Sequence, residues 1–305
     1  MDYDFSICGL RLRAEVPWAL KETAGTAPFL LPPGTPGQPD LTACFQEVDR
    51  LELPETGGVW YEDAYYSSAE GKSRVWHRPA PGEPPYCCVV WDEEFPDIVS
   101  CRYVKGSGHR IAYTRNLLSL LGLEMLLLRF GAFILHASLI DWQGRGVLFC
   151  APSGTGKSTQ ADLWERHMGS QTLNGDRAGI RWDRGVWKAW GLPYAGTSGI
   201  YRNASVLIRA VVLLRQGEEN RICRIGPMEA FKRMLPECSA QRWDIGFMDR
   251  LMGTLSTLVS TVPVYGLECR PDLDAVELLR DQIMKEDGYG YDTGPGGTAD
   301  HGISP

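Results

Sequence analysis

An eight-residue stretch with two closely spaced glycines and a lysine, Ala151–Ser158, constrains this chain more than any other feature of its sequence. It reads A-P-S-G-T-G-K-S, and glycine at positions 154 and 156 lets the backbone turn with its N–H groups facing inward, which forms an anion-binding nest. Lys157 then places a positive charge beside the bound anion, and the Ser158 hydroxyl can ligate a divalent cation. The spacing fits the Walker A pattern, which predicts a loop that holds the phosphates of a nucleotide.

The segments on either side of this loop favour the same interpretation. Val147–Cys150 is a short apolar run that predicts a strand entering the loop, and Lys157–Met168 can form the helix that leaves it. A glycine turn with an incidental lysine is the alternative, but it does not account for this strand and helix. The residues expected to bind the nucleotide are Ser153, Gly154, Thr155, Gly156, Lys157, Ser158 and Thr159.

An acidic residue follows the loop at a spacing that can return it to the nucleotide. Asp176 comes about 18 residues after the loop, once the chain has passed through the predicted helix. A carboxylate there can ligate Mg²⁺ together with Ser158, or it can take a proton from an attacking hydroxyl. The alternative is a turn residue before a strand. The best apolar strand downstream, Val206–Leu214, carries no acid.

The remaining sequence divides into two parts and a tail. Residues 1–110 carry short aromatic and β-branched runs separated by Pro/Gly-rich stretches, which predict a small antiparallel sheet. Residues 111–286 mix helical and strand patterns around the glycine-rich loop, and residues 287–305 are Gly-rich with few aliphatic side chains, which predicts a disordered tail. The predicted fold class is α/β (α+β), with a β-rich N-terminal domain before a P-loop nucleotide-binding domain.

Periodicity predicts further elements of the second part. One helix is expected where apolar residues recur at helical spacing from Leu117 to Leu128, and it ends at Gly131. Pro227 is a favoured first residue for a later helix. The other predicted elements are strands at Phe133–Ile140, Val206–Leu214 and Arg221–Ile225 and helices at Pro227–Met234 and Leu273–Lys285.

Charge and cysteine usage limit the partners and the compartment. The chain of 305 residues has 31 Lys and Arg against 38 Asp and Glu, and this net charge of −7 opposes non-specific binding to nucleic acid or to an anionic membrane. The longest apolar stretch, Leu117–Leu135, contains Glu124 and Arg129, so we expect core elements and no membrane span. Nine scattered cysteines without a C-x-x-C pair, and no signal peptide, indicate a cytoplasmic protein with reduced thiols. Whether it forms a homo-oligomer stays open.

The order of these pieces resembles the catalytic domain of the HPr kinase/phosphorylase family, which shares a nucleotide-binding fold with phosphoenolpyruvate carboxykinases. That family has a strand with a histidine, a short turn, a strand, a Walker A loop, a helix and then an acidic motif of the Asp-Asp-Arg type. The similarity covers about a third of the chain, Phe133–Met234. The matching segments are Leu135–Ser138, Gly144–Gly146, Val147–Cys150, the loop and its helix, and Gly175–Arg177.

The resemblance implies an ATP- and Mg²⁺-dependent kinase. It assigns Asp176 as the general base for a seryl hydroxyl, and Lys157 and Ser158 as the residues that hold phosphate and Mg²⁺. His136 would lie near the phosphates or the acceptor, and Arg177 would steady the transferred charge or a neighbouring acid. Because some relatives phosphorylate the precursors of ribosomally made peptides, the implied acceptor is a peptide or small protein, with a small-molecule hydroxyl as the alternative.

Departures from the family pattern keep other functions open. Gly175 stands where the family has its first Asp, and Gly191–Asn203 contains no copy of the family's later acid-Arg-Gly motif. These differences favour an ATP-binding sensor without phosphotransfer as the second hypothesis. A decarboxylating carboxykinase is a third, although the sequence shows no arginine cluster for oxaloacetate.

Two features of this region have both a purely structural and a functional interpretation. The segment Gly191–Gly199 either closes over the acceptor or the γ-phosphate, or it is a flexible connection between strands. His136 is either a site residue or a buried, hydrogen-bonded strand histidine.

Overall fold

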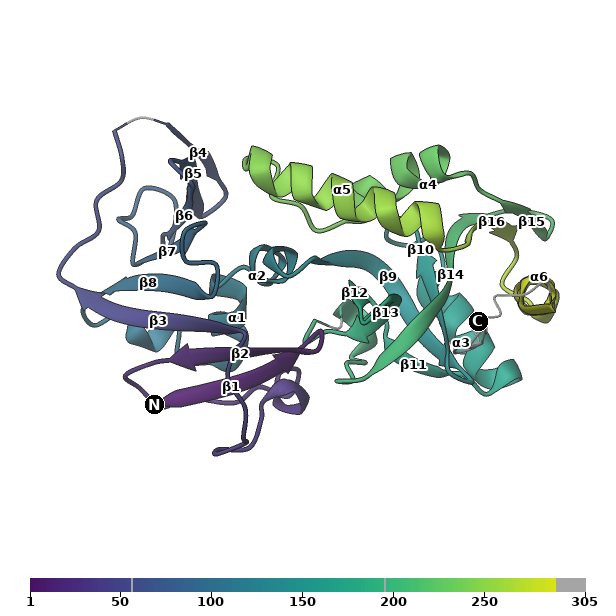
Figure 1. Ribbon diagram of the computed structural model, residues 1–305, viewed down its shortest axis with the longest axis horizontal. Coiled ribbons are helices and arrows are strands. Elements are labelled where there is room, and N and C mark those ends of the chain that lie inside the picture. The colour runs from purple at the N-terminus through teal and green to yellow at the C-terminus, as the bar shows by residue number, and fades with distance from the viewer. Residues whose placement is uncertain (56, 195, 289–305) are drawn as a thin grey trace, which may run out of the picture.

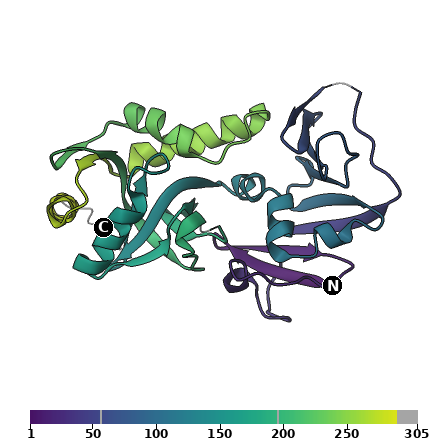
Figure 2. The same cartoon turned by 180° about the vertical axis from the view of Figure 1, so that it is seen from behind.

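The computed structural model describes residues 1–55, 57–194 and 196–288. They form a mixed α+β protein with two eight-stranded sheets. The two sheets lie beside each other along the long axis of the molecule, as both opposite views show (Figures 1 and 2). From residue 289 onward, the predicted tail lies outside the described residues.

The N-terminal sheet has the strand order β1-β2-β3-β8-β7-β6-β5-β4. Its strands are β1 (Asp2–Ile7), β2 (Leu10–Glu15), β3 (Leu41–Val48), β4 (Gly58–Tyr61), β5 (Ala64–Ala69), β6 (Lys72–His77), β7 (Cys87–Asp92) and β8 (Ile98–Val104). The expectation of a small antiparallel sheet is wrong, because β3 pairs in parallel with both β2 and β8. Parallel neighbours need long connections, and the Pro-rich stretch before β3 provides one of them where the sequence suggested only a turn.

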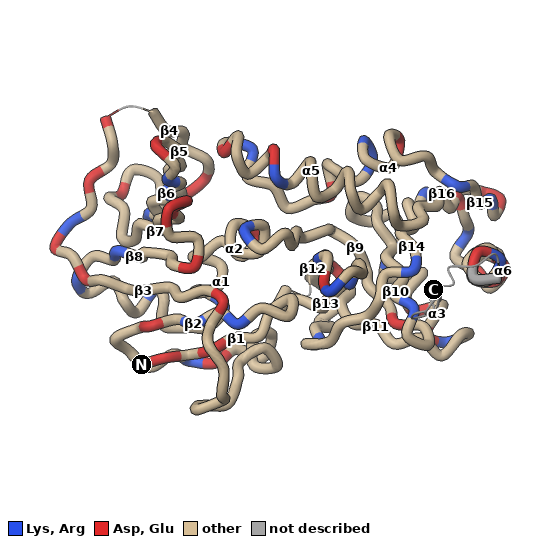
Figure 3. Tube along the Cα trace, viewed as in Figure 1, with Lys and Arg blue, Asp and Glu red and all other residues tan. Residues whose placement is uncertain are grey.

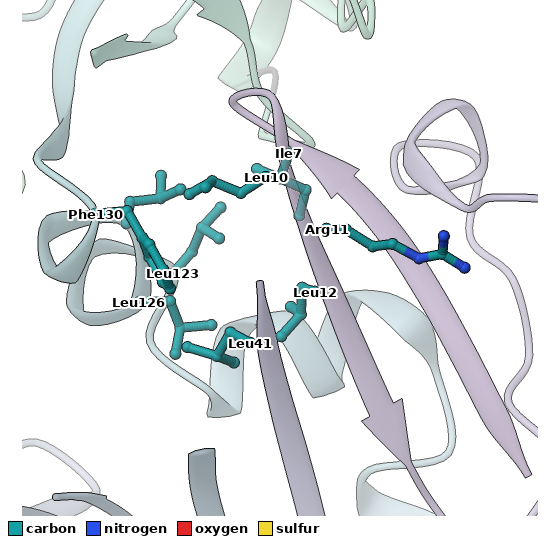
Figure 4. Close-up of a pocket in the computed structure, with 9 residues that line it drawn as sticks. Ile7, Leu10, Arg11, Leu12, Leu41, Leu123, Leu126 and Phe130 are labelled. Carbon is teal, nitrogen blue, oxygen red and sulfur yellow. The ribbon is translucent and has the colours of Figure 1, made fainter. Parts of the chain in front are cut away.

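Two short helices, α1 (Thr114–Leu120) and α2 (Leu123–Arg129), stand in place of the single predicted helix. The helix is interrupted at Gly122, whose φ of +61° lies in the left-handed region that favours glycine. Helix α2 packs against the N-terminal sheet, and Figure 4 shows its apolar side chains facing those of β1–β3 while Arg11 points away. The cavity left at this seam is about 20 Å³ and apolar, so it offers water no hydrogen bonds.

The C-terminal sheet contains a closed ring of paired strands. Its strands are β9 (Ala132–Trp142), β10 (Arg145–Cys150), β11 (Gln171–Asn174), β12 (Arg177–Asp183), β13 (Val186–Gly191), β14 (Ser205–Gln216), β15 (Arg221–Arg224) and β16 (Val264–Cys269). The ring runs β10-β9-β12-β13-β14 and closes because β14 also pairs in parallel with β10. Strands β16 and β15 extend the sheet beyond β14, and β11 pairs with β9.

Helices cover both faces of this sheet. They are α3 (Lys157–Met168), α4 (Pro227–Met234), α5 (Ile245–Thr261) and α6 (Leu273–Gly288). Successive residues of β10 point to opposite faces, so Val147 and Phe149 pack in the cluster that includes Trp164 of α3, whereas Leu148 packs in the cluster that includes Leu251 of α5. A strand buried on both faces reads as a continuous apolar run, which is why Val147–Cys150 was recognisable in the sequence.

Helix α5 ties the two sheets together. Its N-cap residue Asp244 accepts a hydrogen bond from the Phe247 amide at 2.9 Å and another from the Ser73 hydroxyl of β6. Trp243, just before the helix, stacks against Tyr66 of β5 with ring centroids 5.0 Å apart. The apolar cluster next to α5 therefore continues from one sheet into the other.

Charged residues of both signs are interspersed along the described part of the chain (Figure 3). None of the helices in the described ranges is long and apolar enough to cross a membrane. All nine cysteines belong to these ranges, and none of them is in a disulfide.

Candidate functional site

The backbone of the glycine-rich loop turns at its two glycines, Gly154 and Gly156. Gly154 has a φ of +79° and Gly156 a φ of +110°, and a Cβ added at either position would meet no atom within 4 Å. The requirement for glycine is therefore conformational, since L side chains rarely adopt these backbone angles. Strand β10 leads into the loop, and α3 begins at Lys157 directly after it.

Lys157 is buried, with only 7% of its surface exposed, and its ammonium group lies within the loop. It donates hydrogen bonds to the carbonyl oxygens of Ala151 at 2.7 Å and Pro152 at 3.2 Å. Burial lowers the pKa of Lys157 below its ordinary value, and the nearby carboxylates of Glu237 and Asp176 act against this shift. These acids stabilise the positive charge at the loop.

Asp176 lies in the turn between β11 and β12, and Asn174 fixes this turn. The Asn174 side-chain oxygen accepts hydrogen bonds from the amides of Asp176 and Arg177, both at 2.9 Å. Its side-chain nitrogen donates to the carbonyl oxygens of Leu192 at 2.9 Å and Tyr194 at 2.8 Å. Asn174 is fully buried, so one amide side chain joins the Asp176 turn to the segment after β13.

His136 bridges two carboxylates. Its Nε2 lies 3.4 Å from Oδ1 of Asp176, and its Nδ1 lies 3.0 Å from Oε2 of Glu237. Strand pairing brings the two residues near each other, because His136 on β9 is directly opposite Arg177, the residue that follows Asp176 at the start of β12. Glu237 reaches the same place because the Ser239 amide donates to the Ile134 carbonyl of β9 at 2.9 Å.

Arg177 contacts the other side of the Asp176 carboxylate. Its Nε is 3.5 Å from Oδ2 of Asp176, and its guanidinium carbon is 5.7 Å from the centre of the Tyr194 ring. The two oxygens of Asp176 thus face His136 and Arg177, respectively. The carboxylate of Asp176 thus lies between an imidazole and a guanidinium.

Gly196, within the predicted segment Gly191–Gly199, lies against Asp176. A Cβ at Gly196 would be only 2.7 Å from the Asp176 carboxyl carbon, so the backbone here lies against the acid. A Cβ at Gly175 would overlap the Ser198 side chain. Gly196 and Ser198 are therefore packed at the candidate site, and the functional interpretation of their segment stays a prediction.

These groups surround one cavity of about 370 Å³, a volume within the range of small-ligand sites. Lys157 and Ser158 contribute to one side of it, while His136 and Asp176 come from the neighbouring strands. Its lining residues are His136, Ser153, Gly154, Gly156, Lys157, Ser158, Thr159, Gly175, Asp176 and Ser198.

Comparison with known proteins identifies a family. Residues 119–271, just over half of the chain, match the family model described as "SynChlorMet cassette protein ScmC". The chain belongs to this ScmC family. The matched segment contains His136, the glycine-rich loop, Asp176 and Glu237, but not the N-terminal sheet.

Other comparisons add little to the ScmC match. A search of curated proteins gives no match. A solved structure titled "Structure of the Hpr(Ser) kinase/phosphatase from Coxiella burnetii" aligns over 51% of this chain and 93% of its own, with 15% identity and a TM-score of 0.30. That superposition is too loose to support an inference about the ScmC chain.

The structure brings most of the predicted site residues together. His136, Asp176 and the loop residues other than Thr155 line the cavity, and Arg177 contacts Asp176 from outside it. Thr155 lines a separate cavity on the other side of the loop, and its hydroxyl donates to the Pro152 carbonyl at 2.9 Å. In the described part of the chain, no three His, Cys, Asp or Glu side chains form a metal-binding group by themselves.

Two residues of this site, Glu237 and Asn174, were not predicted as members of it, and Ser198 was expected there only as part of the segment Gly191–Gly199. Glu237 comes about 60 residues after Asp176, in the 3-10 helix η4 (Leu235–Glu237), and no local pattern marks it. Ser198 depends on how the segment after β13 folds back. Asn174 carried a usable signal, because Asn two residues before Asp176 can form an Asx turn.

Proposed function

We propose that this ScmC-family chain is a Mg-ATP-dependent phosphotransferase with an HPr kinase-like P-loop domain, and that it phosphorylates a serine hydroxyl of a peptide or small protein. One observation carries the proposal: Asp176 lines the same cavity as Lys157 and Ser158. A carboxylate that faces a phosphate-binding loop is what a kinase needs to place a base near the terminal phosphate.

The loop supplies the binding site for the triphosphate. Its backbone amides, the N-terminal end of α3 and the Lys157 ammonium are all groups that attract an anion. Lys157 is already desolvated, and its ammonium donates two of its three N–H groups to loop carbonyls, which leaves one for a phosphate oxygen.

The chemical step assigns a proton to Asp176. The acceptor oxygen forms a bond to the γ-phosphorus, the bond from that phosphorus to the bridging oxygen breaks, and ADP leaves with the electron pair. The acceptor proton passes to a carboxylate oxygen of Asp176. Positioning and charge stabilisation by the loop and Lys157 supply most of the rate enhancement in such reactions.

The residues present fit a magnesium ion bound mainly through the nucleotide. Mg²⁺ is commonly held by one or two protein groups together with substrate phosphates and water. Ser158 and Asp176 line one cavity and offer a hydroxyl and a carboxylate. When bound there, Mg²⁺ would neutralise phosphate charge.

His136, Glu237 and Arg177 act on Asp176 in this proposal. His136 and Arg177 lie 3.4 Å and 3.5 Å from opposite oxygens of the carboxylate, and Glu237 lies 3.0 Å from Nδ1 of the imidazole. Such contacts hold the base in the orientation that the acceptor requires, and they make His136 and Glu237 positioning residues.

An ATP-binding sensor is the second candidate, and a specific observation favours it. Gly175 stands where the HPr kinase/phosphorylase family has the first Asp of its acidic motif, and Ser198 packs against it. Asp176 is therefore the only carboxylate among the residues that line the cavity. A protein of this kind would bind ATP and transfer nothing. A small-molecule hydroxyl in place of a serine is a variant of the first candidate.

Transfer of label from γ-labelled ATP separates these functions. The protein is incubated with Mg²⁺ and a pool of serine-containing peptides, using the wild type, Asp176→Asn and the control Asp183→Asn. Asp183 is at the far end of β12, the strand that follows Asp176, and it pairs with Lys188 at 2.7 Å. We expect transfer by the wild type and the control, and a loss of about 10²–10⁴-fold in Asp176→Asn.

Each other outcome has a definite meaning. Transfer at the wild-type rate in Asp176→Asn removes Asp176 as the base. Tight ATP binding without transfer to peptides or small alcohols supports the sensor and contradicts the kinase.

A further inference from the structure

A second cavity adjoins the first at Asp176. It measures about 530 Å³ and lies on the other side of this residue from the glycine-rich loop, because Asp176 lines both cavities while Lys157 and Ser158 line only the first. Its lining residues are Thr23, Ala24, Gly25, Thr26, Arg115, Asp176, Arg177, Pro193, Tyr194, Gly196, Gly199 and Tyr201. A group in this second cavity would face the same carboxylate as the end of a triphosphate bound to the loop.

One wall of the second cavity comes from the N-terminal half of the chain and is held firmly. The Lys21 amide donates to the Ala112 carbonyl at 2.7 Å, and the Thr114 amide donates to the Lys21 carbonyl at 3.0 Å. The hydroxyl of Thr114 also accepts from the Thr23 amide at 3.1 Å and contacts the Thr26 hydroxyl. The wall is therefore built before any ligand arrives.

The opposite wall comes from the segment after β13. Gly25 faces it, since a Cβ there would make ordinary van der Waals contact with the Pro193 carbonyl at 3.5 Å and the Tyr201 ring at 3.6 Å. The Asn203 side-chain nitrogen donates to the Pro28 carbonyl at 3.1 Å, which fastens the two walls together. The cavity thus depends on residues 23–26 and 115, which lie outside the ScmC-matched segment 119–271.

The charge of this cavity favours an anion. Two arginines, Arg115 and Arg177, line it against a single acid, Asp176, and Arg177 is already paired with that acid. Arg115 is exposed, and within the described ranges no hydrogen bond or ion pair engages its guanidinium. A guanidinium without a partner beside a cavity is suited to bind a carboxylate through two parallel hydrogen bonds.

The charges of both arginines act on the hydroxyl of Tyr194, which lines the same cavity. Burial raises the pKa of Tyr194, Glu124 raises it further, and Arg177 and Arg115 oppose this rise. Glu124 itself accepts a hydrogen bond from the Gln241 side chain. The guanidinium carbon of Arg177 is 5.7 Å from the centre of this ring, so the ring lies beside one of the two arginines of the cavity.

We propose that the second cavity binds the acceptor segment, and that Arg115 selects acceptor serines that have an acidic side chain nearby in the peptide. This inference rests on the phosphotransferase function proposed above. It gives the N-terminal half of the chain a role in substrate choice, since that half supplies Arg115 and the Thr23–Thr26 wall.

A set of ten-residue peptides tests the proposal. Each contains one serine in an Ala/Gly background and carries either glutamate, glutamine or lysine on both sides of it. Transfer of label from γ-labelled ATP is measured as kcat/KM with the wild type, Arg115→Glu and the control Arg50→Glu. Arg50→Glu changes the net charge by the same amount as Arg115→Glu. Arg50 lies in the connection between β3 and β4, where it forms an exposed ion pair with Glu52.

We expect the wild type and Arg50→Glu to prefer the glutamate peptide over the lysine peptide by about 10-fold at low salt, with a smaller preference at high salt. Arg115→Glu should reverse this order while it keeps the wild-type thermal unfolding and the wild-type ATP-dependent stabilisation. An unchanged order of preference in Arg115→Glu would overturn the acceptor assignment and leave the kinase intact. No transfer to any peptide by the wild type would overturn both.

Discussion

Ser198 occupies the space that a side chain at position 175 would need. A Cβ added to Gly175 would overlap the Ser198 hydroxyl and Cβ, and both residues line the cavity that contains Asp176. An acidic side chain at position 175 would therefore collide with Ser198 in its present position. The two residues form one packing unit at the candidate site.

This relationship predicts a rescue. Gly175→Asp should lower thermal stability and transfer activity, because overpacking of a close contact costs about 1–3 kcal/mol. The double variant Gly175→Asp with Ser198→Gly should recover most of the lost stability, since the interfering side chain is gone. A double-mutant cycle of unfolding free energies measures the coupling, and additive effects would show that the two residues do not share this space.

Gly156 is expected to be intolerant of any side chain. A Cβ at Gly156 would meet no atom within 4 Å, so a steric clash is not the cause. The cause is its φ of +110°, which L side chains rarely adopt. Gly156→Ala should therefore lose about 1–3 kcal/mol of unfolding free energy and most of the ATP-dependent rise in melting temperature. Denaturant unfolding and thermal shifts with and without Mg-ATP measure both effects.

Gly253 provides the matched control for this substitution. It is exposed within α5, and a Cβ there would also meet nothing within 4 Å. Gly253→Ala should stabilise the protein by about 0.5–1 kcal/mol, because alanine is the better helix former. Equal effects of the two substitutions would contradict a conformational requirement at Gly156.

His136 and Glu237 are expected to act as one unit on Asp176. Glu237→Gln and His136→Asn should each lower the transfer rate at least about 10-fold, because each loosens the base. The double variant should be no slower than the slower single variant, since the chain of contacts is broken only once. Glu229→Gln on the exposed start of α4 is the control, and multiplicative losses in the double variant would argue for independent roles.

The stability of the N-terminal sheet should decrease as the solution becomes acidic. Burial lowers the pKa of His77 from 6.5 to about 4, and its Nε2 has no hydrogen-bond partner among the described residues. His77 of the unfolded chain therefore becomes protonated as the pH falls below about 6.5. In the folded protein the same side chain stays neutral until about pH 4. The stabilisation is fully present above pH 6.5, and up to about 3 kcal/mol of it is lost as the pH falls toward 4.

Melting temperatures between pH 7.5 and 4.5 measure this loss. His77→Gln removes the titrating group, so its curve should be flatter than that of the wild type. His109→Gln should keep the wild-type slope, because His109 is exposed beside the Gly106 carbonyl. Parallel curves for all three proteins would contradict the assignment to His77.

The elements that the sequence predicted best are those with a single dominant local signal. The glycine-rich loop and Pro227–Met234 were recognisable because glycine angles and a proline at the first helical position are local requirements. Helix α5 was missed, although Leu251, Leu255 and Leu258 recur at helical spacing and Asp244 precedes the helix as a cap. The closed ring of strands depends on the pairing of β10 with β14, about 60 residues apart, which no local pattern specifies.

The candidate site divides in the same way. Lys157, Ser158 and Asp176 follow from motif spacing, and the structure places all three on one cavity. Glu237, Ser198 and Arg115 come from segments that meet only after the chain has folded, so their positions follow from tertiary contacts. The boundary at residue 110 between the two predicted domains stays a prediction, since one apolar cluster includes residues of both sheets.

A crystal structure of the protein with Mg²⁺ and a non-hydrolysable ATP analogue tests the central claim most directly. The account predicts the triphosphate on the amides of Ser153–Thr159, with its terminal phosphate facing the Asp176 carboxylate. A triphosphate bound elsewhere, or an Asp176 carboxylate turned away from it, would contradict the account.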